Sequence, residues 1–170
     1  MTQILKGPYD RSLATKKIVI DTGPLLIHAT GVFRHDKLKD VCLCDFPDEE
    51  FTFLDRLFIS GKRFYITPYV LSELLYLIRN KLRLNEDGVE KFFHNYGDFL
   101  SKIEESHIDK GKMIDDSGIK FGLADVSLLK TYEKNGALIL SGDETLCQFC
   151  DWRKIEYIEY KTFFFNSFFI

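Results

Sequence analysis

The sequence predicts an α/β fold: a three-layer α/β/α sandwich around a central, mostly parallel sheet. Short apolar runs alternate with segments of helical periodicity, and the linkers between them are short. Two runs, 18–20 and 137–140, contain no polar residue. Such runs are typical of strands buried on both faces of a parallel sheet. A chain of 170 residues that is 45% hydrophobic is long enough for one domain with a sizeable core.

The first strand is expected at 17–20 and ends at Asp21. Thr22 can cap a helix, Gly23 permits a tight turn, and Pro24 sets φ for a first helical turn. The carboxyl ends of strands in open α/β sheets are where ligands bind. Asp21 is therefore a candidate metal ligand or catalytic group, and from this stretch alone it can equally be a helix cap.

One domain is expected at 16–160, with an arm before it and an insertion within it. Residues 1–15 have no strong periodicity and are interpreted as an N-terminal arm. Residues 31–47 have mixed charge and are interpreted as an irregular insertion. The three acids at 48–50 then begin an amphipathic helix that ends before Gly61.

A second strand is expected at 63–66, and a helix at 69–84 follows a Thr-Pro pair that can cap and begin it. Glu73 is the lone acid in the apolar part of this helix. A buried, ionised Glu73 would need an ionic partner, hydrogen bonds or a metal ion. Alternatively, Glu73 lies on a solvated stripe with Ser72 and Tyr76.

The next segments are a helix at 89–103 with apolar residues at helical spacing and a connector at 113–119. A further helix begins near 121 and contains Asp125 in its first turns, where the helix dipole favours a carboxylate. Its core face is expected to consist of Leu123, Val126, Leu129 and Tyr132.

The run 137–140 repeats the pattern of the first strand and leads through Ser141 to Asp143, after which a helix begins. A last strand is expected at 155–160. Residues 161–170 form a Phe-rich tail, which must pack into the core, another subunit or a partner.

Charge and cysteine content limit the function classes. A net charge of −3 does not suit a non-specific nucleic-acid binder, although the series Arg79, Lys81 and Arg83 is a candidate RNA-contacting surface. No apolar stretch reaches the roughly 18 residues of a membrane span, so we expect a cytoplasmic protein. The pairs Cys42/Cys44 and Cys147/Cys150 can be interpreted as a zinc site, but free thiols are favoured.

Four acids can meet at one edge of the predicted sheet: Asp21, Glu73, Asp125 and Asp143. Several carboxylates at hydrogen-bonding distance cannot all stay ionised without a cation. Oxygen ligands without His or Cys favour Mg²⁺ or Mn²⁺ over zinc. Such ions support phosphodiester hydrolysis. The four acids are therefore candidate ligands of one catalytic Mg²⁺ or Mn²⁺ ion.

These stretches resemble the four acidic motifs of PIN domains. The matching stretches, in order, are Ile-Val-Ile-Asp21-Thr-Gly-Pro-Leu-Leu, Thr67-Pro68 with Ser72-Glu73-Leu74, Leu123-Ala124-Asp125, and Leu-Ile-Leu-Ser141-Gly-Asp143-Glu-Thr-Leu. The resemblance covers about residues 16–160. It implies an Mg²⁺- or Mn²⁺-dependent endoribonuclease, commonly the toxin of a VapBC-type toxin–antitoxin pair. It also implies that the four acids surround the metal, with Ser141 in a supporting position. Thr22 is predicted to support the site as well. We expect Asp21 and Asp125 as principal ligands, Asp143 as ligand or support, and Glu73 as ligand or water-orienting base.

Several alternatives stay open. The arm, the insertion and the Phe-rich end differ from the compact toxins of this family. Other PIN proteins process RNA without an antitoxin, and a PIN-like module can hold RNA or protein without cutting. RNA is the expected substrate of both a toxin and an RNA-processing nuclease. An antitoxin is a possible partner, and the chain is expected to form a homodimer. A haloacid-dehalogenase-type phosphatase is disfavoured because Gly23 stands where it needs a second acid.

Overall fold

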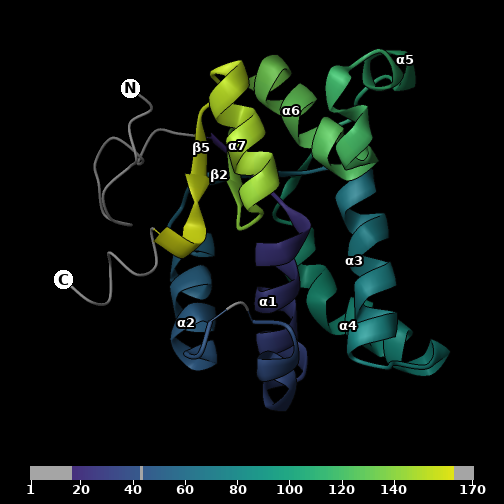
Figure 1. The fold of residues 1–170 in the computed structure, drawn as a ribbon. Helices are drawn as coiled ribbons and strands as arrows, with labels where there is room; N and C mark the ends of the chain where they lie inside the picture. Colours follow the sequence, from purple (N-terminus) through teal and green to yellow (C-terminus); the bar gives the residue numbers. More distant parts are fainter. Residues whose placement is uncertain (1–16, 43, 163–170) are drawn as a thin grey trace.

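The computed structural model describes residues 17–42 and 44–162 of the chain. Five parallel strands in this part form one sheet, in the spatial order β3-β2-β1-β4-β5. Helices lie on both faces, so the fold is the three-layer α/β/α sandwich that the sequence predicts (Figure 1). The strands are β1 (Lys17–Ile20), β2 (Arg63–Ile66), β3 (Glu104–Glu105), β4 (Leu138–Ser141) and β5 (Tyr157–Glu159).

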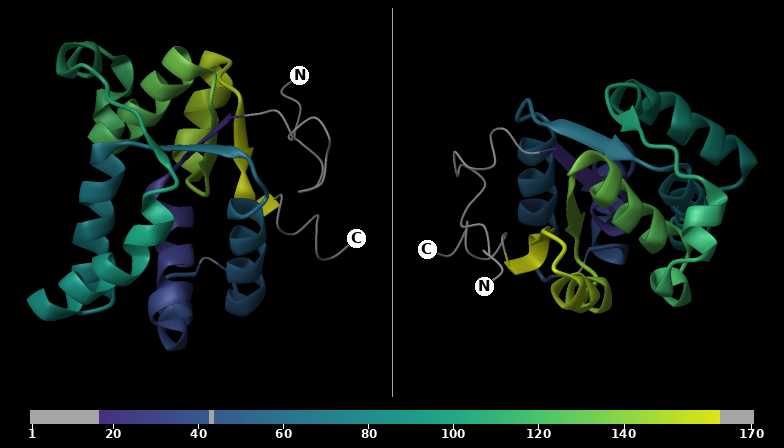
Figure 2. Two further views of the ribbon diagram at one scale, coloured as in Figure 1. Left: turned by 180° about the vertical axis from the view of Figure 1, so that it is seen from behind. Right: turned by 90° about the horizontal axis from the view of Figure 1, so that it is seen from above.

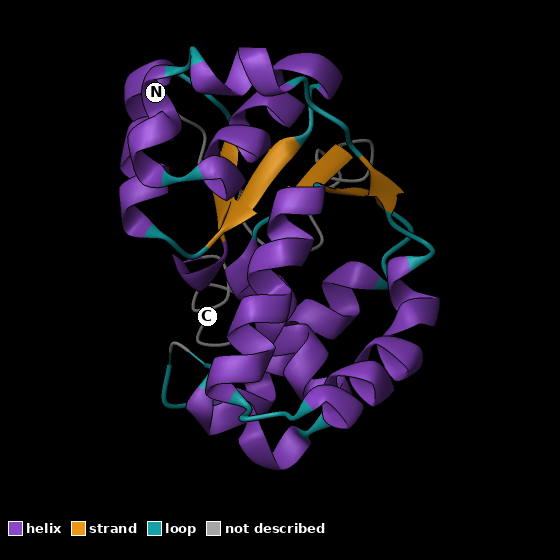
Figure 3. Cartoon of the chain, turned by 90° about the vertical axis from the view of Figure 1, so that its right-hand side faces the viewer, coloured by secondary structure: helices purple, strands orange, loops and turns teal. Residues whose placement is uncertain are grey.

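The helices form two groups, and Figure 3 shows the strands between them. The first group connects β1, β2 and β3, and its α1 packs against α2, α3 and α4. It comprises α1 (Thr22–Phe33), the 3-10 helix η2 (His35–Asp40), α2 (Pro47–Phe58), α3 (Pro68–Lys81) and α4 (Glu86–Leu100). The second group comprises α5 (Lys110–Ile114), the 3-10 helix η3 (Ser117–Phe121), α6 (Leu123–Asn135) and α7 (Glu144–Arg153).

The strand order places a switch point beside β1. From β1 the chain moves outward to β2 and β3, then returns to add β4 and β5 on the other side. β1 and β4 are therefore neighbours whose connections leave in opposite directions, and ligands of open α/β sheets bind at the carboxyl ends of such strands. Asp21 follows β1 directly, and Asp143 lies two residues beyond the end of β4.

Burial explains why these residues form the central strands. Ile18, Val19 and Ile20 of β1 are fully buried, as the absence of polar residues in this run predicts. β2 occupies the predicted residues 63–66. Gly136 ends α6 with φ 63°, in the left-handed region that favours glycine.

A buried histidine connects α1 to its neighbours and so positions the start of α1. The Nδ1 atom of His28 lies 2.7 Å from the Tyr96 hydroxyl of α4, and its Nε2 atom lies 3.3 Å from Asp55 of α2. Burial lowers the pKa of His28, which opposes the raising effect of Asp55. The first helix is thus held by directional contacts as well as by apolar packing.

A second polar network joins η3, α6 and α7. Asp116 is buried, accepts hydrogen bonds from Arg153 and lies 2.7 Å from the ammonium group of Lys130. Burial would raise the pKa of Asp116, but the hydrogen bonds from Lys130 and Arg153 outweigh it and hold this pKa well below its usual range. This network fixes the helix that carries Asp125 against the helix that follows β4.

Several expectations from the sequence differ from the structure. The segment 31–47 is less irregular than expected, because α1 continues to Phe33 and η2 packs its Leu38 into the core. The connector at 113–119 contains the end of α5 and most of η3. Leu123, a predicted core residue, is 45% exposed, because it is the first residue of α6 and the buried residues of that helix begin at Val126.

Some expectations lie outside the described residues. The N-terminal arm at 1–15 and all but the first two residues of the tail at 161–170 are among them. In the part of the chain that is described, none of the helices combines the length and apolar character of a membrane-spanning segment.

Candidate active site

Two of the predicted acids lie at the carboxyl edge of neighbouring strands. The backbone N–H of Asp21 donates to the carbonyl of Leu140 in β4 at 3.0 Å, which ties the end of β1 to the end of β4. Asp21 is the N-cap residue of α1 and Asp143 is the N-cap residue of α7. Because β1 and β4 are parallel neighbours, both carboxylates lie at the switch point of the sheet.

Asp21 is buried and held by two hydrogen bonds. One carboxylate oxygen accepts from the backbone N–H of Thr22 at 2.6 Å, and the other accepts from the Ser141 hydroxyl at 2.6 Å. The side chain is only 8% exposed. Burial, with repulsion from Glu73 and Asp143, raises the pKa of Asp21 to about 6, although both hydrogen bonds lower it. The carboxylate is thus rigidly placed at an electrostatically unfavourable position.

Glu73 is connected to this position through Thr22. The Thr22 hydroxyl donates to a carboxylate oxygen of Glu73 at 2.6 Å, which joins the first turn of α1 to the second turn of α3. The structure favours the solvated alternative for this residue, because Glu73 is exposed. Only one carboxylate oxygen of Glu73 accepts this bond, so the exposed carboxylate can still contact an incoming ligand.

Asp125 enters the same region from α6. It lies in the first turn of that helix, is partly buried, and follows Gly122, which provides no side-chain cap. Burial raises its pKa to about 7, and repulsion from Asp21, Asp143 and Glu73 adds to the effect. All four predicted acids therefore interact electrostatically at one edge of the sheet.

Asp143 acts as an ordinary helix N-cap. One of its carboxylate oxygens accepts from the backbone N–H groups of Thr145 at 2.7 Å and Leu146 at 3.0 Å. Its own N–H donates to the Ser141 hydroxyl at 3.0 Å. The Ser141 hydroxyl thus contacts both strand-end acids.

One contact that sequence reasoning missed sets the distance between α3 and α6. The hydroxyls of Thr67, the N-cap of α3, and Ser127 of α6 lie 2.6 Å apart and are both buried. Ser127 is two residues after Asp125, and no spacing or motif in the sequence marks it. This contact holds the first turn of α6 near the helix that carries Glu73.

The four carboxylates have the oxygen donors that a hard divalent cation prefers, but their side chains are not close enough together to coordinate one ion. Among residues 17–42 and 44–162, no three His, Cys, Asp or Glu side chains stand where together they could hold a metal ion. Charges repel one another over longer distances than a metal–oxygen bond of about 2.0–2.6 Å. The acids can therefore raise one another's pKa values without being placed to coordinate one ion. Mg²⁺ or Mn²⁺ would offset the burial and the repulsion that raise the two pKa values, and would require the side chains to move closer.

The surroundings of the two cysteine pairs do not favour a zinc site. Cys44 donates to Glu50 at 3.2 Å, and the thiols of Cys147 and Cys150 are buried in α7. Burial is the largest cause raising the thiol pKa at all four cysteines, to about 11 at Cys44. All four are free cysteines, and the net effect of their surroundings opposes the thiolate form that zinc binds.

The predicted RNA-contacting series lies at the other end of α3. Arg79 and Lys81 are exposed in its last turn, and Arg83 follows two residues after its end with φ 52°. Cations in the last turn of a helix are favoured by the helix dipole, so their position alone does not indicate a ligand.

No protein-family model matches this chain, and comparison with curated proteins finds no match either. The function is therefore inferred from the geometry and chemistry of the acidic edge and from the resemblance of the four acidic stretches to PIN motifs.

Proposed function

We propose that this chain is an Mg²⁺- or Mn²⁺-dependent endoribonuclease of the PIN type. One observation carries the proposal: Asp21, Glu73, Asp125 and Asp143 repel one another at the switch point of a parallel sheet. Burial and this repulsion raise the pKa values of Asp21 and Asp125, so their two negative charges destabilise the folded state at neutral pH, and selection for stability alone would avoid such a placement. A bound divalent cation offsets this repulsion, which gives the arrangement a functional reason.

The residues of the chain would divide the work as follows. The hydrogen bonds from Ser141 and from the N–H of Thr22 keep both oxygens of Asp21 in fixed positions. The Thr22 hydroxyl orients Glu73, whose exposed carboxylate is accessible to water and to an RNA strand. When bound, the metal would polarise a phosphoryl oxygen and activate water. Asp21 and Asp125 would be its main ligands, with Asp143 as ligand or support and Glu73 as ligand or proton acceptor.

Metal titration and RNA cleavage test this proposal. Mn²⁺ binding is measured by calorimetry, and cleavage is measured on a single-stranded RNA, for wild type, Asp21→Asn and Asp125→Asn. Both variants are expected to lose cleavage by more than about 100-fold, because even losing an outer-shell partner typically costs 10–100-fold. Asp98→Asn, an exposed acid of α4, serves as the control. Wild-type Mn²⁺ affinity and cleavage in Asp21→Asn would refute the assignment.

A module that holds RNA or protein without cutting is the second candidate. The observation that favours it is the absence, within the described residues, of three side chains placed to hold a metal. The same titration separates the candidates, because a binding module would show no Mn²⁺-dependent cleavage while retaining its ligand.

The finer assignment, a toxin neutralised by an antitoxin and assembled as a homodimer, is supported by the sequence resemblance alone. Expression of the wild type is expected to arrest growth, and Asp21→Asn is expected to relieve it. An RNA-processing nuclease without an antitoxin would cleave RNA in vitro without this arrest. Light scattering on the purified chain measures the number of subunits.

A further inference from the structure

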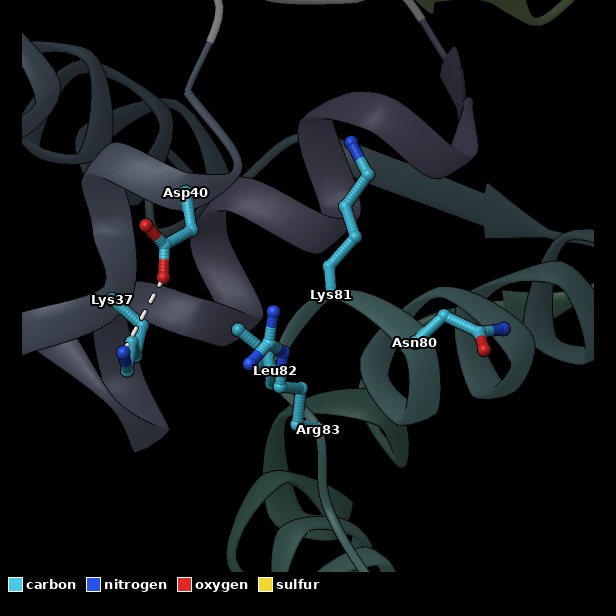
Figure 4. Close-up of a pocket in the computed structure, with 6 residues that line it drawn as sticks. All are labelled: Lys37, Asp40, Asn80, Lys81, Leu82 and Arg83. Atoms are coloured by element: carbon cyan, nitrogen blue, oxygen red, sulfur yellow. Dashed lines mark ion pairs between the residues drawn. The ribbon is translucent and has the colours of Figure 1, made fainter.

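A cavity of about 510 Å³ lies where η2 meets the end of α3. Figure 4 shows the guanidinium group of Arg83 on the side of the Lys37–Asp40 pair, whereas the ammonium group of Lys81 extends upward, away from Arg83, and Asn80 points to the right. The lining residues are Lys37, Asp40, Asn80, Lys81, Leu82 and Arg83. Two segments far apart in the sequence thus bring Lys37 and Arg83 to one hollow, and Lys81 contributes to its wall.

The cavity carries a positive charge that its own residues do not neutralise. Lys37 lies 3.5 Å from Asp40, so these two side chains form an ion pair. Lys81 and Arg83 are exposed and have no ion-pair partner in the described part of the chain. The lining therefore has two uncompensated positive charges in a protein whose net charge is −3.

The dipole of α3 accounts for only part of this cluster. Cations near the last turn of a helix are favoured, which explains Arg79 and Lys81 without a ligand. Lys37 comes from a different element, η2, and Arg83 lies beyond the helix in a left-handed conformation that is uncommon for a residue other than glycine. Their meeting at one cavity needs another reason.

The cavity lies at the far end of two helices that begin at the acidic edge. α1 starts at Asp21 and leads into η2, and α3 carries Glu73 in its second turn and ends at Lys81. The two helices pack against each other and extend in the same direction (Figure 2). At 1.5 Å per residue, the 12 residues of α1 span about 18 Å. An RNA strand several nucleotides long can bridge such a separation.

We propose that this cavity, lined by Lys37, Lys81 and Arg83, binds a backbone phosphate of the single-stranded RNA whose scissile bond lies at the acidic edge. The inference rests on the proposed function and adds a second contact point to it. Arg83 suits a phosphate because its planar guanidinium can donate two parallel hydrogen bonds, and the lysines add charge. The segment 31–47, which has no role in the acidic edge, would contribute Lys37 to substrate binding.

Fluorescence anisotropy with a labelled single-stranded RNA in a metal chelator tests the cavity without cleavage. The variants are Lys37→Gln, Lys81→Gln and Arg83→Asn, the last because asparagine tolerates the left-handed conformation. Each single-strand phosphate contact contributes about 0.7 to the slope of log affinity against log salt, so losing one weakens binding about fivefold at about 0.1 M salt. Lys102→Gln, an exposed lysine outside the cavity, is the matched control and should change neither quantity.

A variant with the opposite effect strengthens the test. Asp40→Asn removes the carboxylate that competes with phosphate for Lys37, so it is expected to tighten RNA binding by at least about twofold. All these side chains are at the surface, and a role limited to folding would not predict tighter binding. Unchanged affinity and salt slope in the three cation variants, or weaker binding in Asp40→Asn, would overturn the proposal.

Competition with inorganic phosphate distinguishes an RNA contact from a site for free phosphate. Added phosphate should weaken RNA binding to wild type more than to Arg83→Asn. Saturable phosphate binding with no effect on RNA would show a free-phosphate site instead and refute the RNA contact.

Metal-dependent cleavage, measured in parallel, separates failure of the cavity proposal from failure of the nuclease proposal. If the cavity variants bind RNA normally while wild type cleaves, the cavity proposal fails alone. If the cavity variants bind RNA weakly while wild type does not cleave, the nuclease proposal fails alone.

Discussion

Asp21→Asn is expected to stabilise the metal-free protein while removing its metal binding. The carboxylate of Asp21 is buried and its pKa is raised from 3.8 to about 6. Because the folded state holds the proton more tightly than the unfolded state, Asp21 favours folding most below pH 3.8. This contribution is lost as the pH rises through about 6. Asparagine stays neutral and loses nothing over this range.

The size of the effect follows from the pKa. At about 1.36 kcal/mol per pKa unit, a rise from 3.8 to about 6 corresponds to about 3 kcal/mol of folding free energy lost above pH 7. Asparagine has one acceptor oxygen where the carboxylate uses two, but the Ser141 hydroxyl can accept as well as donate. We therefore expect a net gain of about 1–3 kcal/mol, which is roughly 2–4 °C in Tm for each kcal/mol.

Urea unfolding followed by circular dichroism measures this difference. In a metal chelator, Asp21→Asn should exceed wild type at pH 8, and the two should converge at about pH 3, below the unfolded-state pKa of 3.8, where the carboxyl is mostly protonated in both states. Asp98→Asn should stay within about 0.5 kcal/mol of wild type. With Mn²⁺ at about 100 times its Kd, wild type should gain about 2.7 kcal/mol and the variant almost none.

A destabilised Asp21→Asn at pH 8 in the chelator would refute the reasoning. That result would mean that the two hydrogen bonds to Asp21 outweigh its burial and the repulsion from its neighbours. The acidic edge would then be a stabilising polar cluster, and its electrostatics would give no reason for a cation to bind there.

Two further predictions concern the same edge. The Mn²⁺ affinity of wild type should weaken on the order of tenfold between pH 8 and pH 6, measured by calorimetry, because Asp125 has a pKa raised to about 7 and must release its proton to bind; a flat profile would contradict this. Thr22→Val should lower RNA cleavage about tenfold with a small change in stability, because it removes the hydroxyl that orients Glu73; Thr22→Ser keeps the hydroxyl and should retain activity.

The strand–helix boundaries explain how much of the site could be predicted. Asp21 ends an unbroken apolar run, and parallel strands deliver their carboxyl ends to one edge, so its position follows from local pattern and topology. β3 could not be predicted, because Glu104 and Glu105 form an exposed two-residue edge strand without an apolar run. Its pairing with β2 exists only once the sheet is formed.

Contacts between distant segments limit prediction in the same way. The bond from Thr22 to Glu73 spans 51 residues, and the contact between Thr67 and Ser127 spans 60. Each joins a polar residue that is common at helix starts to a partner that no spacing marks. The cavity could not be predicted either, because nothing in the sequence indicates that Lys37 and Arg83 lie close together. Sequence patterns located the acids, and tertiary packing selected their partners.

The two strand-end acids differ in how well capping alone explains them. Asp143 accepts from the second and third N–H groups of α7, as an N-cap residue usually does. Asp21 cannot do this fully, because the third residue of α1 is Pro24, which has no N–H. Its second oxygen instead accepts from Ser141 in another strand. Capping therefore accounts for Asp143 but not for the placement of Asp21.

This difference leads to a graded prediction for the two acids. Asp143→Asn should leave stability nearly unchanged, because asparagine caps as well as aspartate, and Asp143→Ala should cost about 1 kcal/mol. RNA cleavage should fall less in Asp143→Asn than in Asp21→Asn. Residue 143 is exposed, and asparagine there loses the negative charge but can still cap α7. Equal losses of cleavage in both variants would show that Asp143 is as directly involved with the metal as Asp21, and that its capping bonds are secondary.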